Sequence, residues 1–453
     1  MKILFIHVSK NWNGRVYAEY PLGVGIMATM ARMNGYDAIV HDMAVDYSSM
    51  VDVLNRHKPD IIGLSFLSTS SRTAKSVINE LRKIHTGPII AGGIHSSIFP
   101  NEVVAQGVDV VVVGEGENKI IPLLNCLKTT AQGSARSMLL GTIPGLVFCD
   151  HDQKIQSSGF DSISVDINLI PPVDRTVYDL SKYTHHSIIT SRGCPYRCKF
   201  CCSWGPGGKK GRMASPERII TEIESLVREF NAKTIYWADD MFFFNKRDRL
   251  QFCNLLKERD FGVEWIAQLR ADNLDSELVD ALKTSGCVKI CIGAETGDAD
   301  LLKSIDKDLT REAIVRGINN SVAGGLKVKT WWIVGLPGAT GINAHLSPLE
   351  IIEETRPHEV AVHNFIPLPG TIYWERAQNY GIHLPDQDSL EDLYYYGIPG
   401  DVRLDYLSKD ELANILYQYQ CVLKQLGYVP TDLASDNDKY VFTSPMQKKG
   451  FSI

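Results

Sequence analysis

The chain has 453 residues, of which 44% are hydrophobic and 22% are charged, and its formal net charge is −6. This composition is typical of a globular protein, and the length favours two or three domains. A mildly acidic chain lacks the basic footprint of nucleic-acid-binding proteins, and no apolar run approaches the ~18 residues that span a bilayer. We therefore expect a cytoplasmic protein with no nucleic-acid partner and no membrane span.

Residues 1–128 alternate short apolar runs with helical patterns such as Pro21–Met33 and Ser71–Ile84. This alternation predicts a doubly wound α/β domain built on a parallel sheet. Sheets of this kind bind ligands beyond the carboxyl ends of their strands. The five apolar runs are Lys2–His7, Asp37–His41, Ile61–Ser65, Pro88–Ala91 and Asp109–Val113.

Small and polar residues follow three of these runs. Ser68 comes after the third run, Gly92 and Gly93 after the fourth, and Gly114 and Glu115 after the fifth. Glycine lets the backbone approach a ligand closely, and a hydroxyl donates hydrogen bonds. The three loops together predict a binding surface at one edge of the sheet.

Residues 129–185 have a weaker pattern, which we interpret as a linker with a small hairpin around Gly145–Cys149. Over residues 186–390 strands and helices alternate again, and Ser215 and Thr310 are expected to cap two of the helices. The stretch holds fewer βα units than a closed eight-fold barrel, so it predicts a partial, open β/α barrel of six strands. The candidate strands are Ser187–Ser191, Thr234–Asp239, Glu264–Gln268, Val288–Gly293, Lys329–Gly335 and Glu359–Ile366.

Residues 391–453 form a tail that contains one amphipathic helical pattern, Lys409–Leu426. We expect this helix to pack over the mouth or the open edge of the barrel. The tail begins with Tyr394, Tyr395 and Tyr396, which are expected either to pack at that interface or to line a substrate pocket.

Three cysteines form a C-x3-C-x2-C loop directly after the first barrel strand: Cys194, Cys198 and Cys201. Iron–sulfur clusters and structural zinc normally take four protein ligands, so three thiolates leave one coordination position open. Two other interpretations remain at this point. The adjacent Cys202 could complete a zinc site, or two of the cysteines could form a disulfide, which a cytosolic location disfavours.

The other barrel strands also end in polar or glycine residues. Asp239 and Asp240 follow the second strand, Arg270 the third, Glu295 the fourth and Gly335 the fifth. Active sites of β/α barrels are built at the carboxyl ends of the strands, so these residues are expected to lie along one edge. One of the two aspartates is expected to face the cavity, and the other to cap the following helix.

The cysteine spacing, with Phe200 just before the third cysteine, resembles the cluster loop of radical S-adenosylmethionine (SAM) enzymes. The resemblance implies that Cys194, Cys198 and Cys201 hold a [4Fe–4S] cluster, whose remaining iron binds the amine and carboxylate of SAM. Tyr196 and Phe200 are expected to shield the cluster from water. The reduced cluster then cleaves SAM to a 5′-deoxyadenosyl radical, which takes a hydrogen atom from the substrate.

The resemblance also implies roles for the strand ends. Glu295 lies in a run similar to one that family members use around SAM, and the turn at Gly335 is similar to one that contacts the adenine. Arg270 is expected to pair with a carboxylate of the cofactor, and Asp239 to orient the cofactor or the substrate.

The first domain resembles the cobalamin-binding domain found ahead of many radical SAM cores, on the segments Ala91–His95, Gly107–Asp109 and Gly114–Glu117. The D-x-H-x-x-G motif that supplies a histidine to cobalt in some cobalamin proteins is absent. The resemblance therefore implies either a corrinoid held without a histidine ligand or a domain kept as a scaffold, and His95 is expected to be structural. The residues expected to bind the corrinoid are Ser68, Gly92, Gly93, Gly114 and Glu115.

The leading hypothesis is cobalamin-dependent radical methylation of a carbon in a small biosynthetic molecule. One alternative is a radical reaction without methyl transfer, such as dehydration of an amino-sugar diol or a rearrangement. A second alternative is a zinc-stabilised binding protein without turnover. The radical hypotheses require an external one-electron donor, either flavodoxin-like, ferredoxin-like or a dedicated reductase.

Overall fold

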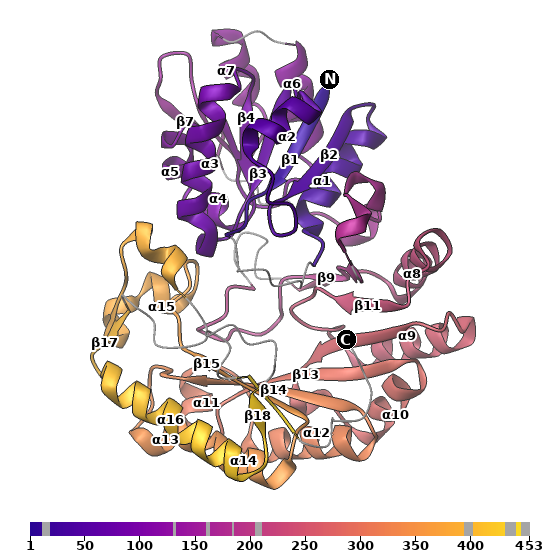
Figure 1. Ribbon diagram of the computed structural model, residues 1–453, viewed down its shortest axis with the longest axis vertical. Coiled ribbons are helices and arrows are strands. Elements are labelled where there is room, and N and C mark those ends of the chain that lie inside the picture. The colour runs from indigo at the N-terminus through magenta and orange to yellow at the C-terminus, as the bar shows by residue number, and fades with distance from the viewer. Residues whose placement is uncertain are drawn as a thin grey trace. The chain divides into compact units, whose positions relative to one another are not determined.

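The chain folds as two compact units, each described here by itself (Figure 1). The first unit contains residues up to Ser187 together with the segment Gln387–Glu391, and the second contains most of the remaining chain. The computed structural model describes residues 1–10, 19–129, 133–159, 164–183, 185–203, 211–393, 402–430 and 441–444. Tyr394, Tyr395 and Tyr396 are outside the described residues.

The first unit is built on a seven-stranded sheet with the order β2-β1-β3-β4-β5-β6-β7. The first five strands are parallel, which confirms the doubly wound α/β fold. The hairpin expected in the linker supplies the last two strands: β6 pairs antiparallel with β5, and β7 pairs antiparallel with β6. The strands are β1 (Lys2–His7), β2 (Asp37–Asp42), β3 (Ile61–Ser65), β4 (Ile89–Gly92), β5 (Val110–Val112), β6 (Leu146–Cys149) and β7 (Ile155–Ser157).

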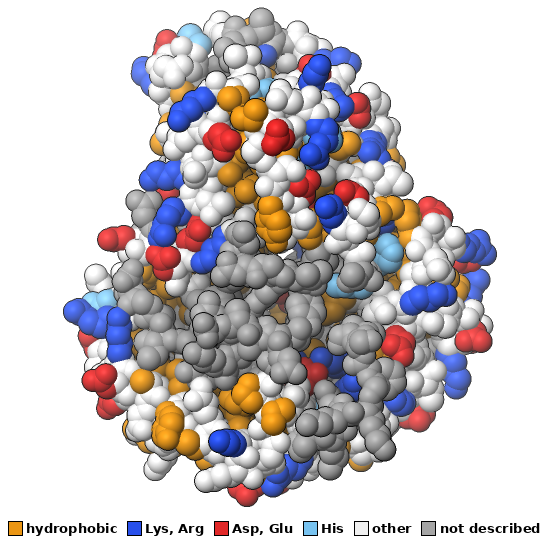
Figure 2. All heavy atoms as spheres, viewed as in Figure 1, with side chains coloured by type: hydrophobic (Ala, Val, Ile, Leu, Met, Phe, Trp, Pro, Cys, Tyr) orange, Lys and Arg blue, Asp and Glu red, His pale blue; other side chains and the backbone are white. Residues whose placement is uncertain are grey.

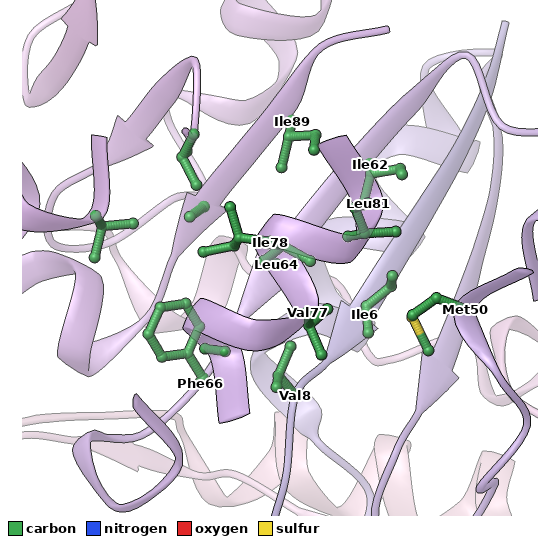
Figure 3. Close-up of a cluster of buried hydrophobic side chains, with 14 of the residues drawn as sticks. Ile6, Val8, Met50, Ile62, Leu64, Phe66, Val77, Ile78, Leu81 and Ile89 are labelled. Atoms are coloured by element: carbon green, nitrogen blue, oxygen red, sulfur yellow. The ribbon is translucent and has the colours of Figure 1, made fainter. Parts of the chain in front are cut away.

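The core of this unit lies between the sheet and the helices that connect its strands. Strand side chains such as Ile6, Ile62 and Leu64 pack against Val77 and Ile78 of α3 (Figure 3). Nearly continuous apolar runs are expected in parallel strands, because helices cover both faces of such sheets. The helices are α1 (Leu22–Met33), α2 (Met50–His57), α3 (Ser71–Ile84), α4 (Ile94–Ile98), α5 (Pro100–Ala105), α6 (Ile120–Thr129) and α7 (Ser134–Leu140).

The second unit contains an eight-stranded sheet with the order β18-β19-β15-β14-β13-β12-β11-β8. Six strands, β8 and β11–β15, lie side by side in chain order, as the open β/α barrel predicts, and a short antiparallel hairpin borders β15. These strands are β8 (His186–Ile188), β11 (Thr234–Trp237), β12 (Glu264–Leu269), β13 (Cys287–Glu295), β14 (Lys327–Val334), β15 (Glu359–Asn364), β18 (Val429–Pro430) and β19 (Val441–Thr443).

The two faces of this sheet differ in burial. Along β14 every second residue, such as Trp332, is fully buried, whereas the residues between them are half-buried. Period-two alternation is the mark of a sheet with one covered and one more open face. We call the half-buried face the inner face. The main helices of this unit are α8 (Pro216–Phe230), α9 (Lys246–Arg259), α10 (Ser276–Thr284), α11 (Ala299–Ser304), α12 (Arg311–Ala323), α13 (Ile342–Leu346), α14 (Pro348–Thr355), α15 (Ile372–Glu375) and α16 (Lys409–Gln425).

Helix starts follow the expected capping chemistry. Ser215 accepts a hydrogen bond from the backbone of Arg218 at the start of α8, and Thr310 accepts one from Ala313 at the start of α12. The tail helix α16 begins with a capping box between Ser408 and Glu411. Each cap satisfies backbone N–H groups that a helix cannot pair internally.

The described surface mixes charges of both signs. On the face drawn in Figure 2, Lys and Arg side chains alternate with Asp and Glu on each unit rather than gathering by sign. Among the described residues, no helix combines the length and the apolar character needed to cross a membrane.

A glycine in α12 provides a test of helix packing. A Cβ atom at Gly317 would lie 2.2 Å from the carbonyl oxygen of Ala271, whereas a Cβ atom at Gly23 in α1 would meet nothing within 4 Å. We expect Gly317→Ala to lower the free energy of unfolding by about 1–3 kcal/mol through overpacking. Gly23→Ala, the matched control, should not, because alanine is the better helix former. Thermal unfolding followed by circular dichroism measures both, and equal melting of the two variants would contradict this packing.

Candidate functional site

The cysteine loop is closed by a short two-stranded ladder. β9 (Ser191–Arg192) precedes the loop, and it pairs antiparallel with β10 (Arg212–Met213), which follows it. Gly193, with φ +68°, turns the chain out of β9 directly before Cys194. The ladder therefore fixes the two ends of the loop that carries the three cysteines.

The three cysteines lie in a desolvated environment. Cys198 is buried, and Cys194 and Cys201 are partly buried. Burial raises the pKa of Cys198 to about 11 and also raises the pKa of the other two thiols, while the positive charge of Lys307 opposes each rise. A coordinating metal deprotonates a thiol outright. Lys307 therefore favours the anionic form that a cluster ligand must take.

The arrangement of the thiols differs from a zinc site. Among the described residues, no three Cys, His, Asp or Glu side chains converge closely enough to hold one metal ion. The four cysteines of the loop belong to this part of the chain, and all are free thiols. A mononuclear zinc site needs four ligands around one ion, whereas thiolates of a cubane cluster bind separate irons. The described side chains therefore include no preformed mononuclear metal site.

Arg270 joins the cysteine loop to a second loop of the barrel. Its guanidinium carbon lies 3.7 Å from the ring centroid of Tyr196. Its nitrogens donate to the carbonyl oxygens of Lys307 and Asp308, each at 2.7 Å, and to both carboxylate oxygens of Asp272, at 3.2 and 3.0 Å. Within the chain, the carboxylate that Arg270 pairs with is thus Asp272, and the pairing of Arg270 with a cofactor carboxylate stays a prediction. Its position makes it a support of the cysteine loop.

Lys199 makes the second attachment of the cysteine loop. Its backbone N–H donates to the carbonyl of Ile305 at 3.0 Å, and its ammonium donates to the carbonyl of Ser304 at 2.5 Å. The ammonium also lies 3.6 Å from the carboxylate of Asp306. The loop between α11 and α12 therefore holds the cysteine loop from one side without using any thiol.

A buried ion pair lies beside the cysteines. Lys307 donates to Glu295 at 2.8 Å, and the lysine ammonium lies 5.9 Å from the centroid of the Phe200 ring. Burial alone would lower the pKa of Lys307, but the Glu295 carboxylate raises it above its ordinary value. Glu295 has φ +67°, and Asp306 and Asp308 on either side of the lysine have φ +52° and +53°. Three non-glycine residues in the left-handed region mark a backbone constrained by its surroundings.

Asp239 supports the strand ends rather than facing a cavity. It is 3% exposed and accepts hydrogen bonds from the backbone N–H groups of Thr190 and Ser191, each at 2.8 Å, and from the Thr190 hydroxyl. Burial raises the pKa of Asp239 to about 7, and these hydrogen bonds oppose the rise. The cap of α9 is Asn245, so the expectation that one aspartate caps this helix is wrong. Asp240 is the exposed one of the two aspartates, and its carboxylate interacts with the hydroxyl of Ser203 beside the cysteines.

Gly335 ends β14 in a turn with φ +86°. Its carbonyl accepts from the hydroxyl of Tyr406 at 2.9 Å, and its N–H donates to Nδ1 of His345 at 3.4 Å. A cavity of about 50 Å³ opens beside it. The cavity is lined by Val334, Gly335, Phe365, Val402, Arg403, Leu404, Leu407, Ser408, Lys409 and Leu412.

In the first unit the loops after β3, β4 and β5 are hydrogen-bonded to one another. Oγ of Ser68 lies 3.1 Å from Nδ1 of His95, which joins the first two loops. The N–H of Gly114 donates to Oγ of Ser97 at 2.9 Å, which joins the second and third. Gly93 has φ +88°, a conformation that side chains rarely adopt. The three loops therefore form one continuous edge, as the sequence predicts.

Two further predicted residues belong to this edge. Gly92 is the last residue of β4, and a Cβ atom there would meet only ordinary contacts at 3.7 Å or more. The carboxylate of Glu115 accepts from the backbone N–H of Val165 at 3.0 Å. Glu115 thus holds the segment that follows the hairpin. This hydrogen bond links the loop after β5 to the segment that contains Val165.

Comparison with known proteins identifies both units. The family model of the B12 binding domain matches residues 15–122, and that of the radical SAM superfamily matches residues 188–343. The chain belongs to the radical SAM superfamily. It is a radical SAM enzyme that carries a B12-binding domain ahead of its core. Its class implies a [4Fe–4S] cluster and SAM as cofactors, and the B12-binding domain supports cobalamin as a third.

Relatives of this radical SAM enzyme include named methyltransferases. It is 26% identical over 370 residues to an uncharacterized methyltransferase of Pyrococcus horikoshii, with 79% of this chain and 78% of the relative covered. It is 25% identical over 376 residues to the anaerobic magnesium-protoporphyrin IX monomethyl ester cyclase of Rubrivivax gelatinosus, with 78% and 65% covered. The second alignment therefore spans less than two thirds of the cyclase.

Solved structures share the fold of this radical SAM enzyme. The methyltransferase TsrM of Kitasatospora setae, solved with cobalamin and a [4Fe–4S] cluster, matches with a TM-score of 0.74 at 16% identity, over 93% of this chain and 88% of that one. OxsB, solved with aqua-cobalamin and SAM, matches with a TM-score of 0.68 at 17% identity, over 98% and 64%. At these identities the likeness concerns the fold.

The residues present fit the implied cofactors. Three free thiols stand beside the cation of Lys307, which favours thiolate ligands. The edge of the first unit offers the hydroxyl of Ser68 and the bare backbone of Gly92 to a flat macrocycle. The cysteine loop thus has thiols suited to an iron–sulfur cluster, and the edge of the first unit has hydroxyl and backbone groups suited to cobalamin.

Sequence reasoning missed several residues of the site. Lys307, His345 and Tyr406 are distant in sequence from every motif, and their roles come from contacts between loops. Lys199 lies within the cysteine motif, but its bonds to residues 304 and 305 are not visible in the spacing. The sequence signal for Lys307 was a lysine between two aspartates before the helix cap at Thr310. That pattern alone describes an ordinary solvated loop.

Replacement of single cysteines separates cluster ligands from a bystander. We expect Cys194→Ala, Cys198→Ala and Cys201→Ala each to lose most of the bound iron, since a cluster held by two thiolates is poorly retained. Cys202→Ala is the matched control, and it should retain iron at the level of the parent. Iron and sulfide analysis after anaerobic reconstitution measures all four. Equal loss of iron in the Cys202→Ala protein would contradict this assignment.

Proposed function

We propose that the chain catalyses cobalamin-dependent radical methylation of a carbon atom in a small-molecule substrate. The observation that carries the proposal is the thiol loop, which Arg270 and Lys199 hold in place while its three cysteines remain available. A B12-binding domain in the same chain supports methyl transfer, as do relatives named methylases, including the hopanoid C-2 methylase of Rhodopseudomonas palustris at 28% identity over 270 residues.

In this proposal Cys194, Cys198 and Cys201 hold the [4Fe–4S] cluster. When bound, the cluster supplies the electron that cleaves SAM to a 5′-deoxyadenosyl radical, and cobalamin supplies the methyl carrier. Tyr196 is fixed under the Arg270 guanidinium, and Phe200 is half-buried near Lys307. These two rings exclude water from the thiols, which protects a radical reaction from side reactions.

The Glu295–Lys307 pair is proposed to receive the amino-acid part of SAM. The carboxylate of Glu295 can accept from the SAM ammonium, and the ammonium of Lys307 can pair with the SAM carboxylate. Their mutual bond at 2.8 Å keeps both charges in place before the cofactor arrives. Gly335 and its adjoining cavity are proposed to take the adenine, because the lining includes the apolar side chains of Val334 and Phe365. Asp239 contributes as a positioning residue.

The edge formed by Ser68, Gly92, Gly93, Gly114 and Glu115 is proposed to hold cobalamin. Its glycines allow close approach of a macrocycle, and its hydroxyl donates to polar groups. We further propose that the enzyme acts in the cytoplasm, where thiols stay reduced. There it receives electrons from a flavodoxin-like or ferredoxin-like protein or from a dedicated reductase.

Product analysis tests the proposed function. The anaerobically reconstituted protein is incubated with cobalamin, a reductant and SAM carrying a deuterated methyl group. Methyl transfer predicts both S-adenosylhomocysteine and 5′-deoxyadenosine. 5′-Deoxyadenosine alone would favour dehydration or rearrangement without methylation, and stoichiometric zinc without iron would favour a binding protein without turnover. Either of these results would overturn the proposed methylation.

Replacing Lys307 tests the SAM site. We expect Lys307→Met to raise the KM for SAM by about tenfold or more, because a charge-assisted hydrogen bond contributes roughly 1.5–3 kcal/mol. Lys307→Arg should recover part of the loss. Lys303→Met, which changes an exposed lysine of α11, is the control and should leave KM unchanged. Initial rates of 5′-deoxyadenosine formation give KM. An unchanged KM in Lys307→Met, at parental iron content, would contradict the role.

A further inference from the structure

The inner face of the second unit carries charged residues that the cluster and SAM do not use. Lys329 of β14 is in register with Cys291 of β13 on one side and with Glu359 of β15 on the other. Residues in register on parallel strands direct their side chains to the same face. Trp331, two residues further along β14, therefore shares this face with Lys329.

An ion pair across β14 shows that these side chains share the inner face. Lys289 of β13 and Glu359 of β15 flank β14, and their charged atoms are 2.7 Å apart. Their side chains retain 20% and 13% of their exposure. The inner face at this level is thus neither tightly filled nor fully open.

Lys329 is left with an uncompensated charge. Glu359 is taken by Lys289, and within the described part of the chain Lys329 has neither a hydrogen bond nor an ion pair. Its ammonium lies 6.0 Å from the centroid of the Trp331 ring. Burial and the nearby Lys329 charge lower the pKa of His363 to about 3, so that imidazole is neutral. A partly desolvated, unpaired ammonium is suited to an anionic ligand.

The position of Lys329 sets a distance to the reacting edge. It precedes Trp332, the residue in register with Glu295, by three residues, which corresponds to roughly 10 Å along a strand. The indole of Trp331 lies between the two levels. Further along the sheet, Gln268 of β12 is in register with Cys291 at the level of Lys329, and it donates to the hydroxyl of Tyr236 of β11 at 3.3 Å. An elongated molecule could therefore lie along this face from Lys329 to the carboxyl edge.

We propose that Lys329 binds an anionic group of the substrate and that Trp331 contacts the apolar body next to it. The substrate is then an organic acid or a phosphorylated compound whose reacting carbon lies on the order of 10 Å from its anionic group. This inference rests on the proposed function only for the statement that the substrate reacts at the carboxyl edge. The anion site itself follows from the charges of the inner face.

Calorimetric titration of the reconstituted holoenzyme tests the proposal with three probes of one shape: 4-phenylbutyrate, its neutral amide and 4-phenylbutyl phosphate. We expect the parent protein to bind at least one anion about fivefold or more tightly than the amide, equivalent to about 1 kcal/mol. Tighter binding of 4-phenylbutyrate would indicate a site for a carboxylate, and tighter binding of 4-phenylbutyl phosphate would indicate a site for a phosphate. Equal affinity for all three probes would overturn the proposal.

Variants locate the effect at Lys329. Lys329→Met should abolish the preference for anions, and Lys329→Arg should keep it. Glu359→Gln should strengthen anion binding, because it removes the competing carboxylate of the inner face. A preference that persists in Lys329→Met would overturn the proposal. These measurements do not depend on methyl transfer, so a failure to form S-adenosylhomocysteine would remove the proposed function while leaving the anion site standing.

Discussion

The attachment of the cysteine loop to the barrel is the constraint on which the site depends. Thiols that must bind metal cannot also anchor their own loop, so other groups have to do so. Arg270 anchors the loop through its planar guanidinium, which donates to two carbonyl oxygens and one carboxylate. The face of the same guanidinium stacks on the ring of Tyr196. Lys199 adds backbone and side-chain bonds to the same neighbouring loop. Both anchors end on residues 304–308, which also present Lys307 to the thiols.

This arrangement explains why a buried ion pair is retained beside the thiols. Desolvating two charges is costly, and removing one partner of such a pair commonly destabilises a protein by about 3–5 kcal/mol. The Glu295–Lys307 pair also stands on left-handed backbone at Glu295, which adds strain. Packing alone gives no reason for either cost. The proposed contact of both charges with the cofactor gives such a reason. The Lys307 cation favours thiolate ligands, and the ion pair complements the ammonium and carboxylate of an amino acid.

The sequence predicts the strands well and the contacts between loops poorly, for physical reasons. β1 and β3 were predicted at their observed bounds because buried parallel strands are uninterrupted apolar runs flanked by turns. The cysteines were recognisable because ligand spacing is local. The support that Arg270 gives to the cysteine loop was not predicted, because its partners lie near residue 308, which no local pattern connects to it. Likewise, the choice between Asp239 and Asp240 depends on which one turns toward Thr190, a question of strand register.

The second unit separates two kinds of charge along its strands. At the carboxyl edge Glu295 and Lys307 are paired, so the site that we propose for SAM holds its two charges in place before the cofactor binds. Three residues deeper than Trp332, which is in register with Glu295, β14 carries Lys329 without a hydrogen-bond or ion-pair partner among the described residues. An unpaired charge raises the energy of the empty protein, and a ligand of opposite sign recovers that energy on binding. Cofactor chemistry can then stay constant while residues of the inner face vary to select the substrate, because the two levels share a strand but no side chain.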